Sequence, residues 1–234
     1  MRSCACRHNP PVSLSALATV VAVSFFAVGK PAVTRAAERE TRDFSVRVDG
    51  KAAGRYLMTI ERRDDGTICV QGNAKVKVSY IVVAYRYSYE GTEVWKDGRL
   101  LQLKSSADDD GKAYAVSAWA DGNALRGRCN GKEQTTVADV WLTTYWHAPD
   151  PQFRNKSIPL VDADNGKCLT AHLQYEGTRQ ITVMGQPLDC YYYRLTGAGL
   201  QVELWYDGHE RLVREESLED GHRMTLELAH MSRP

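Results

Sequence analysis

The sequence predicts an all-β protein, mainly antiparallel, whose strands form one strongly curved meander sheet: a barrel or open half-barrel plugged by one short helix. From Arg42 onward the dominant hydrophobic period is two residues, which is typical of strands with one face on a core and the other toward water. Asp-Gly and Asn-Gly pairs, which suit tight hairpins, recur along the chain. At the usual spacing of about 8–12 residues they indicate about a dozen strands. A flat sheet of that size is unstable, so we expect the sheet to curl or close.

The first element is an N-terminal targeting segment. Basic residues precede an uncharged apolar run at 12–28, and the small residues Thr34 and Ala36 follow it. This order is typical of a secretory signal peptide, so we expect residues 1–36 to be removed and the mature protein to be periplasmic or secreted. The run falls short of the roughly 18 apolar residues of a membrane-spanning helix. An uncleaved anchor is the alternative; otherwise we expect the chain to meet a membrane only transiently, during export.

The remaining residues, 37–234, are predicted to form a single curved antiparallel β domain, since about 200 residues suit one domain with its own core. Residues 1–36 hold four basic residues and no acidic one, so the mature chain carries 26 basic and 29 acidic residues. A nucleic-acid-binding protein is expected to have a strongly basic surface. We therefore predict no nucleic-acid partner.

The cysteine count points to disulfides. An even number in an exported chain is typical of disulfide pairing, and three connectivities are open. The cysteines that remain after residue 36 are Cys69, Cys129, Cys168 and Cys190. No CxxC pair occurs in the sequence, so a structural zinc site is not expected.

Two aspartate-rich stretches, 108–112 and 162–167, resemble calcium loops at first sight. Neither stretch has both the glycine at the sixth position and the glutamate at the twelfth that an EF-hand loop requires. Both are better explained as turns between strands. We therefore expect no metal and no cofactor.

The strands themselves are predicted where apolar side chains alternate with polar ones. The apolar positions that share a face are Phe44, Val46 and Val48; Ile68, Val70, Val76 and Val78; Tyr114, Val116 and Ala118; Leu169, Ala171, Leu173 and Tyr175; Leu200, Val202, Leu204 and Tyr206; and Met224, Leu226 and Leu228.

The alternation stops at residues 137–148. Asp139 stands where a helix N-cap belongs, and Pro149 and Pro151 prevent the helix from continuing. The apolar residues between them would cover most of a helical circumference, so such a helix must be buried. We expect a short helix near 139–147 that plugs the concave side of the sheet.

Two aromatic sets provide the candidate ligand-binding residues. One set shares a face of the strand near 84–96, and the other lies in the predicted helix. The candidates are Tyr85, Tyr87, Tyr89, Trp95, Trp141, Tyr145, Trp146 and His147. Ligand pockets are mostly apolar with a few placed polar groups, which these residues could supply. In the alternative interpretation the aromatic rings only fill the core and the His147 ring bonds to a backbone group.

Several segments together resemble an uncharacterised family of exported bacterial proteins, a domain of unknown function. They are "FSVRVDGKAAGRYLMTI" (44–60), "VVAYRYSYEGTEVWKDGRLLQLKSSADDDGKAYAV" (82–116), "TTYWH" (143–147) and "YRLTGAGLQVELWYDGHERLV" (193–213). That family is similar in its strand–turn pattern to the open β-barrels typified by the lipoprotein-localisation factors. The resemblance implies a curved sheet and plugging helices around an apolar cavity that holds acyl chains. It implies no catalytic residue.

Three functions remain open at the level of the sequence. The first is a non-catalytic protein that binds an apolar or amphipathic ligand, such as a lipid, in the cavity of a barrel. The second is a structural or assembly module with a solid barrel that docks an envelope protein partner. The third is a hydrolase-like enzyme that uses His147. No GxSxG, HExxH, P-loop or GxGxxG motif is present, so we assign no catalytic residue and favour the first function.

Overall fold

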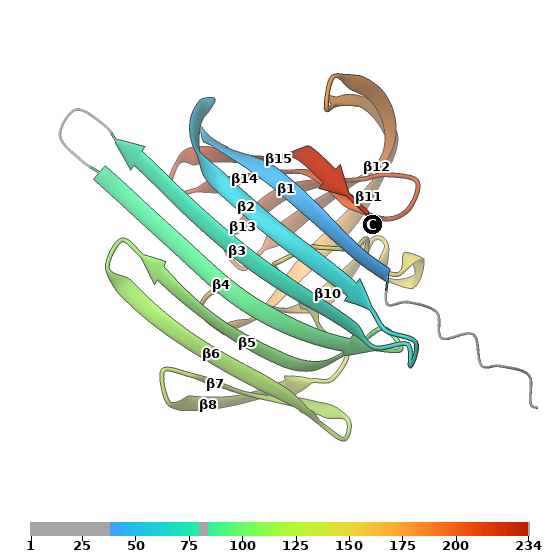
Figure 1. Ribbon diagram of the computed structural model, residues 1–234. Helices are drawn as coiled ribbons and strands as arrows, with labels where there is room; N and C mark the ends of the chain where they lie inside the picture. The colour runs from blue at the N-terminus through green and yellow to red at the C-terminus, as the bar shows by residue number, and fades with distance from the viewer. Residues whose placement is uncertain (1–37, 80–83, 234) are drawn as a thin grey trace, which may run out of the picture. The chain divides into compact units, whose positions relative to one another are not determined.

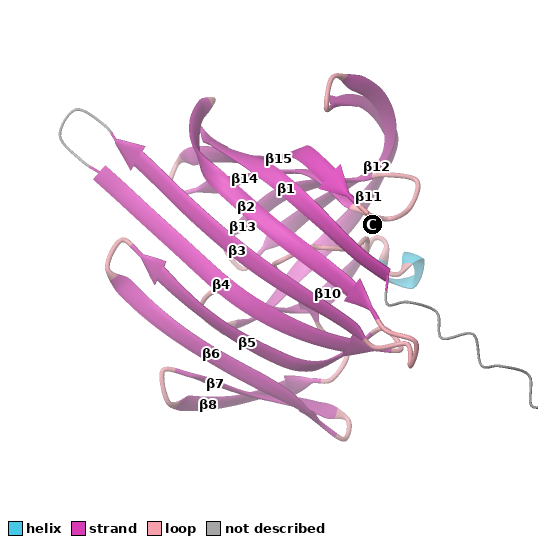
Figure 2. Ribbon diagram, in the orientation of Figure 1, coloured by secondary structure: helices cyan, strands magenta, loops and turns pink. Residues whose placement is uncertain are grey.

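The computed structural model describes residues 38–79 and 84–233, and nearly all of them lie in one sheet (Figures 1 and 2). The sheet has fifteen strands. They are β1 (Glu38–Val48), β2 (Lys51–Arg62), β3 (Ile68–Ser79), β4 (Ala84–Lys96), β5 (Arg99–Asp109), β6 (Lys112–Asp121), β7 (Ala124–Cys129), β8 (Lys132–Val137), β9 (Trp141–Leu142), β10 (Lys156–Val161), β11 (Cys168–Val183), β12 (Gln186–Gly197), β13 (Leu200–Tyr206), β14 (Leu212–Glu219) and β15 (His222–Ser232). The predicted signal peptide, 1–36, lies outside the described residues.

The strand order is β8-β7-β6-β5-β4-β3-β2-β1-β15-β14-β13-β12-β11-β10-β9. Neighbours are antiparallel except β9 and β10, which are parallel. The first and last strands therefore pair in the middle of the sheet, where Phe44 lies opposite Leu228. The two edge strands, β8 and β9, do not pair with each other, so the predicted curved, mainly antiparallel sheet is confirmed as an open one. No helix in the described ranges is long and apolar enough to cross a membrane.

Alternation along the strands decides which face is buried, as predicted. The inward positions of β1 alternate with more exposed ones, and Phe44 is fully buried. Leu103 on β5, Leu173 on β11 and Leu204 on β13 are also fully buried. These side chains come from strands far apart in the sheet order yet belong to one hydrophobic core. That is possible only because the sheet curves around them.

The predicted Asp-Gly and Asn-Gly turns make the hairpins tight. At Asp97-Gly98 and Asp110-Gly111 both central residues have positive φ, between 49° and 88°. This conformation follows the right-handed twist of the flanking strands, and Asp and Gly tolerate it better than most residues. The Asp-Gly and Asn-Gly pairs therefore marked hairpin turns because these residues tolerate the backbone conformation that a tight hairpin needs.

The predicted helix near 139–147 is wrong. Trp141 and Leu142 form β9, which pairs with Leu160 and Val161 of β10, and Tyr145 has a left-handed φ of 46° that an α-helix cannot contain. The segment is buried on all sides, as predicted, because it runs inside the curve of the sheet. Such burial produces the same apolar pattern as a buried helix. The one helical element within the described residues is a 3₁₀ turn at Pro151–Phe153.

The predicted disulfides are not present: all four described cysteines are free. They lie on four different strands, β3, β7, β11 and β12. Of these four strands, β11 and β12 are neighbours. Cys190 of β12 lies opposite Arg179 of β11, and Cys168 of β11 lies opposite Val161 of β10. The register therefore places no cysteine opposite another. Cys190 is buried and Cys168 is exposed.

Candidate ligand-binding cavity

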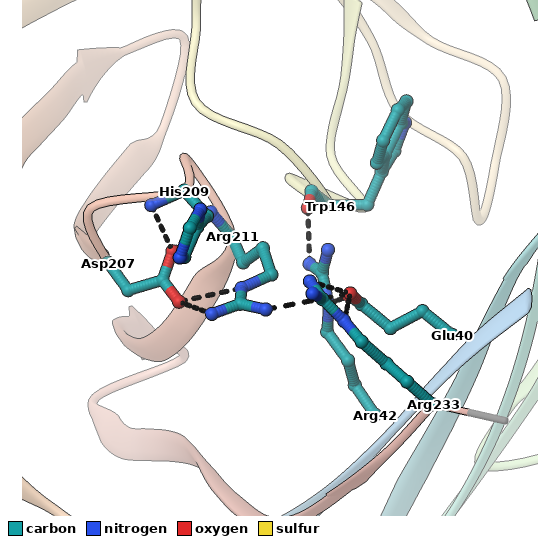
Figure 3. Close-up of polar contacts among 7 residues, drawn as sticks. All are labelled: Glu40, Arg42, Trp146, Asp207, His209, Arg211 and Arg233. Atoms are coloured by element: carbon teal, nitrogen blue, oxygen red, sulfur yellow. Dashed lines mark hydrogen bonds and ion pairs between the residues drawn. The ribbon is translucent and has the colours of Figure 1, made fainter. Parts of the chain in front are cut away.

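A buried charged network closes one part of the interior (Figure 3). Arg42 on β1 is 1% exposed. Its Nε donates to Oε1 of Glu40 and its Nη1 donates to the backbone oxygen of Trp146, both at 2.5 Å. Arg42 therefore ties the internal segment 141–148 to the wall of the sheet.

The same network extends to the loop between β13 and β14 and to the residue that follows β15. Arg211 pairs with Asp207 at 2.5 Å and with Glu40 at 3.7 Å, and Arg233 donates to Glu40 at 2.6 Å. Burial raises the pKa of Glu40, but Arg42 and Arg233 outweigh it, so the pKa lies below its ordinary value. Each buried carboxylate here faces an arginine. A paired, buried network of this kind makes the structure rigid.

His147 lies beside this network and not in a cavity. Its ring packs against Trp95 and Trp146, with centroid distances of 5.7 Å and 4.2 Å. Nδ1 is 2.6 Å from the backbone oxygen of Ala148, so Nδ1 carries the proton and donates it. Burial lowers the pKa of His147 to about 4. The imidazole is therefore neutral near pH 7, with Nδ1 bonded to backbone, and a ring with so low a pKa is a weak base.

A cavity of about 330 Å³ lies elsewhere inside the curve. Its walls come from β1 to β6 and from β13 to β15, and residues Thr143–Tyr145 of the internal segment also line it. The apolar lining residues are Val46, Ala74, Val76, Ala107, Leu200, Val202, Met224 and Leu226. The volume is within the range of about 300–1,000 Å³ that is typical of small-molecule sites.

Six tyrosines also line the cavity: Tyr56, Tyr85, Tyr87, Tyr89, Tyr114 and Tyr145. Period-two alternation on β4 turns three of them inward. Gly72 and Gly91, which are opposite each other on β3 and β4, leave space for two of the rings. A Cβ atom at Gly72 would lie only 2.7 Å from Oη of Tyr56, and one at Gly91 would overlap Tyr89. The rings therefore occupy the space that two side chains would otherwise fill.

Carboxyl groups form the polar part of the lining. Asp164 accepts a hydrogen bond from Tyr87 at 2.6 Å, and Asp109 accepts one from Tyr85 at 2.8 Å. Burial, followed by repulsion from Asp162, raises the pKa of Asp164 to about 7. Burial, followed by repulsion from Glu219 and Asp164, raises the pKa of Glu215 to about 8. Ionisation of these groups is therefore costly in the folded protein.

The structure separates the eight predicted ligand-binding residues into two groups. Those that line the cavity are Tyr85, Tyr87, Tyr89 and Tyr145; those that do not are Trp95, Trp141, Trp146 and His147. Trp141 packs against Tyr145 with ring centroids 5.0 Å apart. The other three residues of the second group pack together near Arg42.

The carboxyl groups are the residues that the sequence reasoning missed. Asp162 does form a turn, since its Oδ1 accepts from the backbone N of Asp164, but the Asp164 side chain faces Tyr87. Glu215 pairs in register with Leu204 and Leu226, two inward positions. The sequence did contain a signal for Glu215: an acidic residue at a strand position whose side chain the alternation predicts to point inward.

Comparisons with known proteins give a family and a fold. The family model described as "Domain of unknown function (DUF6134)" matches residues 44–229. Among solved structures, the chain is similar to a beta-barrel-like protein of domain of unknown function DUF1849 from Brucella abortus. The TM-score is 0.58 at 9% sequence identity, over 85% of this chain and 98% of that one. This likeness concerns the fold alone. No curated protein matches the chain.

Proposed function

This chain belongs to the family described as a domain of unknown function, DUF6134, and we propose that it is an exported, non-catalytic protein that binds an apolar or amphipathic small molecule, such as a lipid, inside its curved sheet. The cavity of about 330 Å³ carries this proposal. It is lined by apolar side chains and tyrosine rings with a few polar groups, which is the usual composition of a small-molecule site.

The polarity of the lining supports an amphipathic ligand. Tyr56, Tyr89 and Tyr145 are at most 7% exposed, and they surround the deep part of the cavity. Asp109 and Glu219 also line it but are exposed, so they mark its more open part. A ligand with an apolar part and a polar part would match this gradient.

The two other functions have less support. The large apolar side chains that are exposed, such as Leu57, Trp119 and Met184, lie on different parts of the sheet. Single exposed apolar residues are normal on soluble surfaces and do not mark a docking patch. For an enzyme, the candidate base His147 is bonded to backbone and packed between tryptophans.

The test compares two equal substitutions on neighbouring strands. Ala107 on β5 lines the cavity and is 5% exposed, whereas Ala115 on β6 is exposed on the outer face. We expect Ala107→Phe to fill the cavity and to weaken binding of the neutral probe N-phenyl-1-naphthylamine at least tenfold. Ala115→Phe should leave that affinity unchanged. Fluorescence titration gives the affinities, and far-UV circular dichroism shows that each variant is folded.

Native mass spectrometry of protein purified from the periplasm provides a second measurement. We expect wild type and Ala115→Phe to carry a co-purified small molecule that denaturation releases, and Ala107→Phe to lack it. Equal probe affinity in folded Ala107→Phe and wild type would overturn the proposal. So would wild-type protein that binds no probe and carries no ligand.

A further inference from the structure

The ionisable side chains of the cavity are of one sign. Its lining includes Asp109, Asp162, Asp164, Glu215 and Glu219. No lysine, arginine or histidine lies among the described residues that line it. These acids come from β5, from β14 and from the loop between β10 and β11, so they surround the cavity from more than one side.

The charged network near Trp146 shows how different this arrangement is. There, Glu40 is paired with Arg42 and Arg233, and Asp207 is paired with Arg211. In contrast, none of the ion pairs found within residues 38–79 and 84–233 involves any of the five cavity acids. The same sheet therefore pairs its acids with arginine in one place, and in the cavity leaves the five acids without an ion pair among the described residues. Lys112 lies opposite Asp109 at the end of the β5–β6 hairpin, with its ammonium group 5.3 Å from the centre of the Tyr114 ring.

Partly buried acids without an ion pair, such as Asp164 and Glu215, are costly to ionise, and a bound cation offsets that cost. Burial and mutual repulsion raise the pKa values of Asp164 and Glu215. Hydrogen bonds from Tyr87 and Tyr85 offset this cost only with neutral donors. A positive charge placed among these groups would favour their ionised forms and bind to them in return.

The tyrosine rings favour an organic cation. The negative face of an aromatic ring attracts ammonium groups, and desolvated contacts are the strongest. A metal ion fits less well, because the described residues contain no group of three or more His, Cys, Asp or Glu placed to hold one. An anionic lipid would face five acidic side chains.

We infer that the cavity selects a ligand with a positively charged organic group, a protonated amine or a quaternary ammonium, joined to an apolar part. This inference rests on the proposed binding function and specifies the ligand class of the same site. The cation lies against the carboxyl groups of Asp164 and Glu215, and the apolar part lies along the tyrosines and aliphatic side chains. Ligands with the same tail and a negative group are rejected by like-charge repulsion.

The experiment uses three probes with one tail: octyltrimethylammonium, octanol and octyl sulfate. Isothermal titration at pH 8, at low ionic strength and below micellar concentrations, gives the three affinities. We expect the ammonium probe to bind at least tenfold more tightly than octyl sulfate, with octanol between them. Added salt should weaken binding of the ammonium probe and leave binding of octanol unchanged.

Matched variants test whether the carboxyl groups of Asp164 and Glu215 cause the preference for the ammonium probe. Asp164→Asn combined with Glu215→Gln removes from the cavity the two carboxyl groups that a bound cation would hold in their ionised forms, without a large change of shape. It should weaken the ammonium probe at least tenfold and leave octanol binding intact. The control is Glu203→Gln combined with Glu216→Gln, an opposed pair on the outer face of β13 and β14, which should change neither affinity.

The outcomes separate the two claims. If wild type binds octanol but prefers the ammonium probe no more than octyl sulfate, the charge inference is wrong and the cavity remains a neutral binding site. The inference also fails if the folded cavity variant keeps the full preference for the ammonium probe. If wild type binds none of the three probes, the proposed binding function itself is wrong.

Discussion

Glu93 shows at the scale of one residue what burial without a cation costs. It lies on the inward face of β4 and is 2% exposed. The indole N–H of Trp95 donates to its carboxyl group at 2.6 Å, but no arginine or lysine pairs with Glu93 among the ion pairs of the described residues. Burial raises the pKa of Glu93 to about 7, and its hydrogen bonds offset this only in part. The group is therefore protonated in the folded state well above the pH at which a free glutamate ionises.

This pKa predicts the direction of a pH effect on stability. The unfolded chain has a glutamate pKa of about 4.3, so between that value and about 7 the folded state binds more protons. Proton binding by Glu93 therefore stabilises the folded state fully below the unfolded pKa, and this stabilisation is lost as the pH rises through the folded pKa. We expect Glu93 to remove about 1 to 2 kcal/mol of unfolding free energy between pH 6 and pH 8.5. Glu93→Gln should lose less stability than wild type by that amount, while Asp164 and Glu215, whose pKa values are also raised, lower the stability of both proteins over this interval.

Urea unfolding at the two pH values measures the effect, and only the difference between them is compared. Glu90→Gln, an exposed position on the same strand, serves as the control and should keep the wild-type slope. His147 acts in the opposite direction, but only below its unfolded pKa of about 6.5, because burial lowers its folded pKa to about 4. Parallel pH dependences for wild type and Glu93→Gln would contradict the assignment.

The sequence could place inward tyrosines but not inward acids. Period two puts Tyr85, Tyr87 and Tyr89 on one face, and all three line the cavity. Glu215 follows the same geometry on β14, whereas Asp164 lies in the turn between β10 and β11. An acid at either place is ordinarily read as a surface or turn residue. Their role depends on the tertiary surroundings, in particular on the absence of arginine from the lining, and a single strand does not contain that information.

At the scale of an element, the internal segment 141–148 raises the question of how irregular backbone survives in a core. Buried backbone groups must find hydrogen-bond partners. The N–H of Thr143 donates to Val161, and the N–H of Ala148 donates to Glu210. Two side chains add further bonds: the hydroxyl of Tyr206 donates to the oxygen of Tyr145, and Arg42 donates to the oxygen of Trp146. The segment is thus held by both walls of the sheet.

Arg42 is the contact whose loss should matter most. Arg42→Ala removes the donor to Trp146 and leaves the buried Glu40 with a weaker set of cations. Removal of one partner of a buried ion pair typically costs about 3–5 kcal/mol, and we expect a destabilisation of that size. Arg47→Ala, at an exposed position of the same strand, should change stability by no more than about 0.5 kcal/mol.

Urea unfolding followed by tryptophan fluorescence and by circular dichroism measures both variants. If Arg42→Ala and Arg47→Ala have equal unfolding free energies, the charged network does not anchor the segment. A loss of the Trp146 environment in Arg42→Ala before global unfolding would support the anchoring role directly.

The same segment, 141–148, shows what the sequence could and could not predict about a single element. Its apolar composition and the two prolines after it predicted burial and a stop, and Trp141, Leu142, Tyr145 and Trp146 are all buried. Its conformation could not be predicted from the sequence, because a buried extended segment and a buried helix both lack polar residues. Pairing with β10 decided between them.

At the scale of the whole sheet, one non-local pairing joins two runs of hairpins. Strands β1 to β8 follow one another along the sheet in one direction, and β15 to β9 follow in the other. Each step is local except the contact of β1 with β15, where Thr41 lies opposite Ser232. Local turn signals predicted the hairpins, but they contain no information about this contact, about the single parallel pair or about the open edge.

This topology predicts slow formation of the β1–β15 pair, because a loop of nearly the whole domain must close before the contact forms. A circular permutant should remove that step. Arg233 already donates to Glu40, so a short Gly–Ser linker can join Arg233 to Glu38. The new ends can be opened at the exposed Asp139, between the edge strands β8 and β9, because these consecutive strands of the described sheet do not pair with each other, so no hairpin is cut. We expect refolding at least about tenfold faster than for the linear chain, since β1 and β15 become a hairpin.

A second permutant with the same linker, opened at the β11–β12 turn where Met184 is 50% exposed, is the control, because its β11–β12 pair then spans nearly the whole chain. Both permutants should keep the native circular dichroism spectrum, but the second should refold no faster than the linear chain, since it exchanges one non-local pair for another. Stopped-flow tryptophan fluorescence provides the rates. If the permutant opened between β8 and β9 is folded but refolds no faster than the linear chain, β1–β15 pairing is not the slow step. Nucleation would then lie within one of the two runs of hairpins, each of which is already local in sequence.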